Sequence, residues 1–211
     1  MRKQRVVFKP DVRRRQLLNA AIRVFAKRGF RAAGVSDIVQ AAGVARGTFY
    51  LYFEGKAQAF MAIADDFYDR LEQAIEIDDP PSAGTDGVDG RSALRASFFR
   101  WFEFFYVNRE AATVILKEAP AIDLRFDRGI AELRQTTLEH FSSRFHRFQE
   151  LGLVRSSLSP GIAAHLQIGM FEELVKAFVL TADHPDIDAL ADHMADFEWN
   201  GVRPGISPGI N

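Results

Sequence analysis

The chain has 211 residues, of which 47% are apolar, with no cysteine and a formal net charge of −1. This apolar fraction is too high for a disordered chain, and the lack of cysteine excludes disulfides and thiolate metal sites. The basic start, Met1 to Arg5, leads into Lys9-Pro10-Asp11 rather than an apolar core, so we expect no signal peptide. Every long apolar stretch carries charged residues, and none is predicted to cross a bilayer. We therefore expect a cytoplasmic protein without membrane contact.

The charge is unevenly distributed along the chain. Residues 1–56 contain thirteen Lys or Arg and three Asp or Glu, a balance of +10. The remaining 155 residues contain 14 Lys or Arg and 25 Asp or Glu, a balance of −11. A basic head joined to an acidic body is typical of a protein that binds a polyanion. A solvated basic face without a partner is the alternative, because charge asymmetry alone is a weak signal.

Four helices are predicted in the first 77 residues, at 13–28, 36–42, 45–52 and 56–77. In the first, Leu18, Ile22 and Phe25 repeat at helical spacing, and Gly29 follows the last basic turn as a stop signal. Ser36 is the expected N-cap of the second helix.

The two short helices predict a helix-turn-helix. Ile38 and Val39 can pack inward, and Gly43 supplies the backbone freedom of a sharp turn. Phe49 and Phe53, four residues apart, can anchor the next helix to the core. The outward side chains of that helix fit a major groove, where Arg can reach a guanine edge and hydroxyls suit phosphate oxygens. A lysine at the following helix N-terminus adds a further anion contact. The residues expected at the DNA are Ser36, Ala45, Arg46, Gly47, Thr48, Tyr50, Tyr52 and Lys56.

After a loop at 78–91 that is rich in Pro and Gly, the chain predicts further helices and almost no strand. These helices are placed at 92–108, 109–118, 124–151, 160–181 and 185–199. The predicted fold is therefore all-α with about nine helices. We divide it into a helix-turn-helix domain with a basic N-terminal arm (1–56), a helical body (57–200) and a frayed tail (201–211).

The head resembles the DNA-binding domain of the tetracycline-repressor (TetR) family of bacterial regulators. The matching segments are Phe25-Ala-Lys-Arg-Gly-Phe30, Asp37-Ile38, Ala42-Gly43-Val44, Gly47-Thr48-Phe49-Tyr50, Tyr52-Phe53 and Gly55-Lys56. They lie in about the first quarter of the chain. Val35 and Ala45 depart from the family pattern, where Thr and Ser are common, and each removes a hydroxyl that could contact phosphate. The resemblance implies a body that binds a small effector and forms a homodimer.

The body shows no catalytic constellation. His140 and His146 are six residues apart and do not share a helical face, and no pair of histidines has the H-E-x-x-H spacing. We therefore expect no metal, no cofactor and no enzymatic activity.

The body does carry an excess of aromatic residues. The segment 97–106 is apolar nearly all round, so its helix must be covered on more than one side. A well-filled core is the alternative for any single aromatic residue. The resemblance implies a cavity among the middle helices, and an aromatic lining favours a flat or hydrophobic effector over a highly charged one. The residues expected in its wall are Trp101, Phe102, Phe105, Phe141 and Phe171.

The helix at 160–181 has more apolar surface than one subunit can cover. One face is therefore predicted to meet a second copy of the chain and, with the last helix, to form a four-helix bundle. In the TetR family this pair of helices is the usual dimer interface. The residues expected there are Leu166, Met170, Leu174, Phe178, Leu190, Met194 and Phe197.

The sequence thus predicts a sequence-specific transcriptional regulator, a repressor that a small hydrophobic or aromatic effector releases from a near-palindromic operator on double-stranded DNA. Two alternatives remain open. One is an all-helical small-molecule-binding protein or enzyme whose basic end is incidental. The other is a non-specific architectural DNA binder, against which the groove-facing Arg46 and Thr48 argue.

Overall fold

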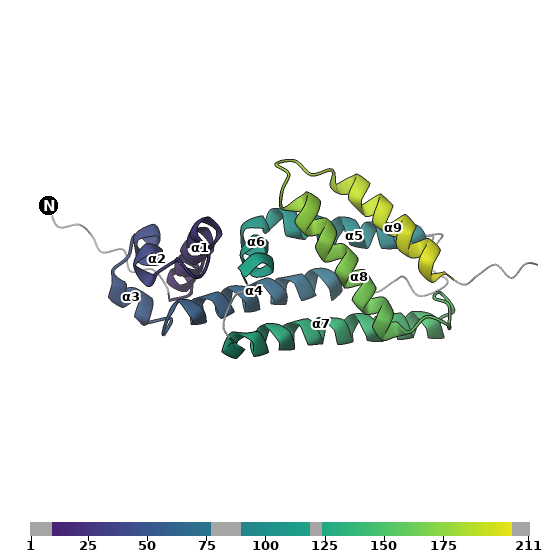
Figure 1. Cartoon of the computed structure of the whole chain (residues 1–211), viewed down its shortest axis with the longest axis horizontal. Helices are drawn as coiled ribbons and strands as arrows, with labels where there is room; N and C mark the ends of the chain where they lie inside the picture. The colour runs from purple at the N-terminus through teal and green to yellow at the C-terminus, as the bar shows by residue number, and fades with distance from the viewer. Residues whose placement is uncertain (1–9, 77–89, 119–123, 204–211) are drawn as a thin grey trace, which may run out of the picture. The chain divides into compact units, whose positions relative to one another are not determined.

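The computed structural model describes residues 10–76, 90–118 and 124–203, and every element within these ranges is a helix (Figure 1). The helices are α1 (Pro10–Arg28), α2 (Val35–Ala42), α3 (Arg46–Tyr50), α4 (Lys56–Glu76), α5 (Gly90–Val107), α6 (Arg109–Glu118), α7 (Leu124–Glu150), α8 (Pro160–Leu174) and α9 (Ile187–Val202). A π-helical turn, Val175–Val179, follows α8 directly. The prediction of an all-α chain with a helix-turn-helix head is confirmed.

The chain forms two compact units. The first comprises residues 1–68 with 110–130, and the second comprises 69–109 with 131–211. The division therefore falls within α4, whereas the sequence placed the domain boundary at the start of this helix. Helix α6 belongs to the first unit although it follows α5 of the second.

The first unit is built around three phenylalanine rings. Phe25 of α1, Phe30 of the following loop and Phe60 of α4 are all buried, and their ring centroids lie 5.4 to 6.1 Å apart. Gln16 of α1 donates a hydrogen bond of 2.7 Å from Nε2 to the carbonyl of Ala42, the last residue of α2. The buried rings thus pack α1 against α4, and the side chain that satisfies a helix-terminal carbonyl fixes α1 against α2.

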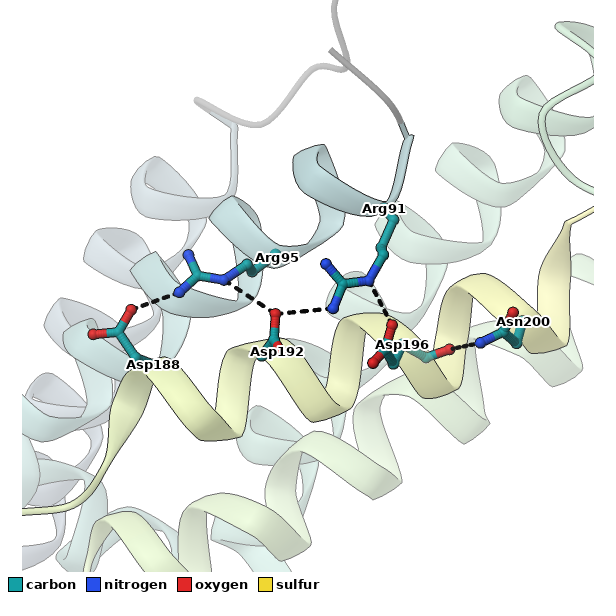
Figure 2. Close-up of polar contacts among 6 residues, drawn as sticks. All are labelled: Arg91, Arg95, Asp188, Asp192, Asp196 and Asn200. Carbon is teal, nitrogen blue, oxygen red and sulfur yellow. Dashed lines mark hydrogen bonds and ion pairs between the residues drawn. The ribbon is translucent and has the colours of Figure 1, made fainter.

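In the second unit, α5 and α9 lie side by side (Figure 1). Figure 2 shows a ladder of ion pairs along them, in which Arg91 and Arg95 alternate with Asp188, Asp192 and Asp196. The three aspartates are four residues apart and so share one face of α9. The hydrogen bonds from Arg91 to Asp196 and Asp192 raise the pKa of Arg91 further above its already high value.

The close approach of these two helices depends on Gly90. A Cβ atom at this position would lie 2.4 Å from the ring of Trp199 on α9, which is closer than any real contact. The first residue of α5 must therefore lack a side chain for α9 to pack as it does.

Three details differ from the sequence prediction. Helix α9 begins at Ile187 with Asp186 as its N-cap, because the Asp186 carboxylate accepts from the N–H of Ala189, so Pro185 precedes the helix. The predicted helix 160–181 is α-helical only to Leu174. Gly201 and Val202, assigned to the tail, belong to α9, and residues 204–211 lie outside the described part of the chain.

Candidate nucleic-acid interface and ligand-binding core

The turn between α2 and α3 is determined by backbone geometry. Gly43 has φ 64° and ψ 35°, in the left-handed region that residues with a Cβ rarely adopt. Its N–H donates to the carbonyl of Gln40, and the N–H of Val44 donates to the carbonyl of Val39 at 3.1 Å. These two bonds form a Schellman motif, which ends α2 and directs the chain into the next helix.

The start of α2 is held by a carboxylate. Asp37 accepts a hydrogen bond of 2.9 Å from the N–H of Gly34 and forms an ion pair with Arg28 of α1. The Gly34 bond, with a smaller contribution from Arg28, lowers the pKa of Asp37 below its usual value. Gly34 is the N-cap, so Ser36 lies inside the helix rather than at its cap as the sequence suggested.

Helix α3 is anchored by Phe49, which is fully buried and lies 5.5 Å from the ring of Phe53. Of the residues predicted to contact DNA, five are exposed and three are half-buried. The exposed ones are Ser36, Ala45, Arg46, Gly47 and Tyr50, and the half-buried ones are Thr48, Tyr52 and Lys56. The sequence prediction missed Leu51, whose side chain is 82% exposed. An exposed leucine next to groove-facing residues is a candidate apolar contact for a thymine methyl group.

Arg46 and Tyr50 act as a pair on this face. The Arg46 guanidinium donates to the Tyr50 hydroxyl at 3.3 Å and lies 5.8 Å from the centre of the tyrosine ring. Both residues are exposed, one helical turn apart. The tyrosine thus orients a guanidinium that would otherwise sample many rotamers.

Lys56 makes structural hydrogen bonds that the sequence did not predict. Its Nζ donates to the carbonyls of Phe30, Arg31 and Ala33 at 2.7, 3.0 and 2.8 Å. The ammonium also lies 4.7 Å from the centre of the Phe30 ring. Because an ammonium has three donors, these carbonyls use all of them. Lys56 therefore ties the loop between α1 and α2 to the start of α4, and contact with phosphate would require one of these bonds to break.

The five aromatic residues expected in the ligand chamber form one continuous cluster in the second unit. The Phe171 ring stacks on Phe102 at 4.7 Å and contacts Phe105 and Trp101 edge-on at 5.4 and 5.8 Å. Trp101 in turn contacts Phe141 at 5.4 Å. All five are buried. The cluster thus joins α5, α7 and α8.

Polar side chains that the sequence prediction missed lie at the edge of this cluster. The Arg144 guanidinium lies 5.3 Å from the Trp101 ring centre. Gln167 donates from Nε2 to both carboxylate oxygens of Glu198 at 3.0 Å. Burial raises the pKa of Glu198 to about 7, although the charge of Arg144 and the hydrogen bond from Gln167 act in the opposite direction. Their signal in the sequence is a polar residue on an otherwise apolar helical face, such as Gln167 four residues after Ala163 and four before Phe171.

Comparison with known proteins bears directly on this arrangement. Residues 17–63 match the tetR family of bacterial regulatory proteins. The HTH-type transcriptional regulator TtgR of Pseudomonas putida is 39% identical over 208 residues, which cover 93% of each chain. The uncharacterized HTH-type transcriptional regulator YdgC of Bacillus subtilis is 30% identical over 192 residues, 90% of this chain and 93% of that protein. The chain belongs to the tetR family.

A solved structure of a tetR-like fold agrees over nearly the full length. The fatty acid degradation regulator FadR from Bacillus halodurans has a TM-score of 0.76 and 24% identity, covering 94% of this chain and 100% of that chain. That likeness shows the fold, and membership of the tetR family makes the protein a DNA-binding transcriptional regulator.

The expected dimer residues of this tetR regulator divide into three groups by exposure. Leu166 and Phe178 are more than half exposed in the single chain, and Phe197 is 69% exposed. Met170, Leu174 and Leu190 are half-buried. Met194 is only 3% exposed and packs within its own subunit, so its side chain has almost no surface to offer a partner. It was expected at the interface because a sequence pattern cannot tell which of two apolar faces is already covered.

The π-helical turn preserves the predicted apolar stripe. The N–H of Leu180 donates to the carbonyl of Val175 at 2.9 Å, five residues back. The turn keeps Val175 and Val179 buried and leaves Phe178 exposed. Residues four apart therefore keep the same exposure through this segment: Phe171, Val175 and Val179 are all buried, whereas Leu166 and Phe178 are exposed.

The described residues contain neither a cluster of metal ligands nor a membrane-spanning helix. No group of three or more His, Asp or Glu side chains among them could hold a metal ion. Within the same part of the chain, no helix is long and apolar enough to cross a membrane.

Proposed function

We propose that this tetR-family regulator is a repressor that binds a near-palindromic operator through α3 and leaves it when a small apolar effector enters the body. The observation that carries the DNA-binding part is the surface of α3. Exposed side chains that can contact base edges lie there, and the buried pair Phe49 and Phe53 holds their helix in place. A two-fold dimer would present two such helices to two half-sites.

The effector part of the proposal is supported by the aromatic cluster around Phe171 and Trp101. A buried, largely apolar set of rings with a few polar groups is the usual lining of a small-molecule site. The dimer part is supported by the exposed apolar residues of α8 and α9, including Leu166 and Phe197.

Two further properties follow from this proposal. We infer that the chain acts by binding rather than by catalysis, since the regulators it resembles act on transcription. We also infer a cytoplasmic location, because that is where a bacterial operator is found.

The test of DNA recognition is a selection of bound fragments from random DNA, followed by titration of the enriched operator and a scrambled duplex at several salt concentrations. Arg46→Ala should weaken operator binding by about 1–3 kcal/mol per half-site and relax base choice there. Tyr50→Phe is the matched control for orientation, because it removes the hydroxyl that Arg46 contacts but keeps the ring.

Three results would count against the proposal. If no sequence is enriched, the protein is a non-specific DNA binder. If Arg46→Ala loses affinity equally for both duplexes, Arg46 contacts phosphate and base choice depends on other residues. If the native chain shows no salt-dependent DNA binding, its basic end is incidental.

A further inference from the structure

We propose that the indole N–H of Trp101 and the amide oxygen of Gln167 form a polar recognition point in the aromatic cluster, which binds a hydroxyl group of an otherwise apolar effector. This rests on the effector-controlled function proposed above and specifies the chemistry of the ligand.

The first observation is that two buried polar atoms lack a partner. Trp101 and Gln167 are each 2% exposed. Trp101 Nε1 and Gln167 Oε1 are fully buried and make no hydrogen bond in the structure. Most buried polar atoms in folded proteins are hydrogen-bonded, because a buried donor or acceptor without a partner is costly. A ligand or a water molecule that satisfies both atoms would remove that cost.

The second observation is that a continuous chain of neighbouring residues connects Trp101 and Gln167. The Trp101 ring lies beneath the Arg144 guanidinium at 5.3 Å, and the charge of Arg144 acts on the carboxyl of Glu198. Glu198 accepts two hydrogen bonds of 3.0 Å from Gln167. Gln167 is one helical turn before Phe171 on α8, and the Phe171 ring returns to Trp101 at 5.8 Å. The two residues therefore lie in the same part of the core of the second unit, and we infer that their unpartnered atoms face one ligand group.

The chemistry of the two atoms selects a hydroxyl group. The indole N–H only donates, and the amide oxygen only accepts. A hydroxyl can accept from Trp101 and donate to Gln167 at the same time. A ligand carboxylate could accept from Trp101, but it could not donate to Gln167 and would lie near the carboxyl of Glu198. A hydrocarbon or an ether leaves at least the amide oxygen unsatisfied.

The experiment compares three naphthalene derivatives of nearly equal size: 2-naphthol, 2-methoxynaphthalene and 2-naphthoate. Their affinities for the full-length protein are measured by calorimetry. The indole N–H signals are followed in parallel by NMR on isotope-labelled protein. The chain has two tryptophans, so Trp199 supplies an internal reference and Trp101→Phe assigns the signals.

We expect 2-naphthol to bind about tenfold more tightly than either analogue, the value of one buried hydrogen bond, and to shift the Trp101 indole signal downfield. Trp101→Phe should weaken both 2-naphthol and 2-methoxynaphthalene about tenfold, because the hydroxyl and the ether oxygen each accept from the indole N–H. Gln167→Met should weaken only 2-naphthol, to the affinity of 2-methoxynaphthalene, because it replaces the amide acceptor with an apolar group of similar length.

Each other outcome would overturn the proposal. Equal affinity for 2-naphthol and 2-methoxynaphthalene would mean that a bound water satisfies the two atoms. Preference for 2-naphthoate would mark an anion site at Arg144. No shift of the Trp101 signal with any compound would mean that the site is closed to ligands. Operator titration without any compound tests the DNA-binding function separately, so failure of the two can be distinguished.

Discussion

The two units of this regulator contain aromatic clusters that differ in what they leave unsatisfied. In the first unit Phe25, Phe30 and Phe60 form an apolar core, and the nearby ammonium of Lys56 has three carbonyl partners. In the second unit the rings lie beside polar side chains, and Trp101 Nε1 is buried without a hydrogen-bond partner. In a core that only supports DNA-contacting residues, every buried polar group can have a hydrogen-bond partner. A core that receives a ligand, as we propose for the second unit, keeps polar groups without partners so that the ligand can bind to them.

The largest expected effect concerns the surface that joins two copies. Leu166→Arg should convert the dimer to monomers, because burying an unpaired guanidinium at the interface costs about 3–5 kcal/mol. Light scattering on the purified variant measures this directly. Leu51→Arg is the matched control, since Leu51 is an exposed leucine of the first unit. A dimer that survives Leu166→Arg, or one that Leu51→Arg disrupts, would place the interface elsewhere.

The second prediction tests the carboxyl in the core of the second unit. Burial raises the pKa of Glu198 from 4.5 to about 7. Between pH 4.5 and about 7, Glu198 is therefore protonated in the folded protein and ionised in the unfolded protein. The contribution of this group to stability is therefore highest at low pH and decreases from about pH 4.5 until the pH has risen through about 7. From pH 5 to 8 the wild type should lose about 2–3 kcal/mol more than Glu198→Gln.

Urea unfolding at several pH values measures this difference. The Gln variant keeps the size of the side chain and removes its titration, so processes elsewhere cancel in the comparison. Parallel pH profiles for the two proteins would show that Glu198 is ionised with a normal pKa in the folded state.

The third prediction concerns the packing of α5 on α9. Gly90→Ala should destabilise the protein by about 1–3 kcal/mol, because the added methyl group overlaps the Trp199 ring. The matched control is Gly161→Ala in the first turn of α8, where a Cβ would meet no atom within 4 Å. Thermal unfolding of both variants checks the prediction. Equal melting temperatures would mean that the α5–α9 contact is looser than described.

The smallest expected effect separates support from DNA contact in the first unit. Lys56→Met keeps the aliphatic stem over Phe30 but removes the ammonium, so it should cost about 1 kcal/mol of stability. If Lys56 supports the loop, the salt dependence of DNA binding should stay unchanged. A salt slope lower by about one unit per subunit would instead identify a direct phosphate contact.

The sequence was most informative where a local pattern determines the structure. Gly43 between two short apolar segments predicted the turn, and the spacing of Phe49 and Phe53 predicted the anchor of α3. The five aromatic residues predicted to line a ligand chamber are neighbours in the structure. They were found because large rings on helices of one domain tend to share its core.

The features that escaped prediction depend on partners distant in the sequence. Lys56 reaches carbonyls 23 to 26 residues away, and Gln167 and Glu198 are 31 residues apart. The hydrophobic periodicity of a helix does not indicate which distant residue a polar side chain will contact. Met194 was misplaced for a related reason, because an apolar residue between two candidate surfaces is assigned only when the packing of its own helix is known.

The π-helical turn at Val175–Val179 has a consequence for how relatives of this protein are aligned. A π turn contains one residue more than the α-helical turn it replaces, and the extra residue is absorbed without breaking the helix. A homologue that is one residue shorter in this segment can therefore keep an ordinary helix from Pro160 to Leu180, with the residues before and after the turn in the same places. A one-residue gap at this place in an alignment would therefore mean that the π turn is replaced by an α-helical turn, and not that a loop is lost. Phe178 is the side chain whose direction such a deletion would change.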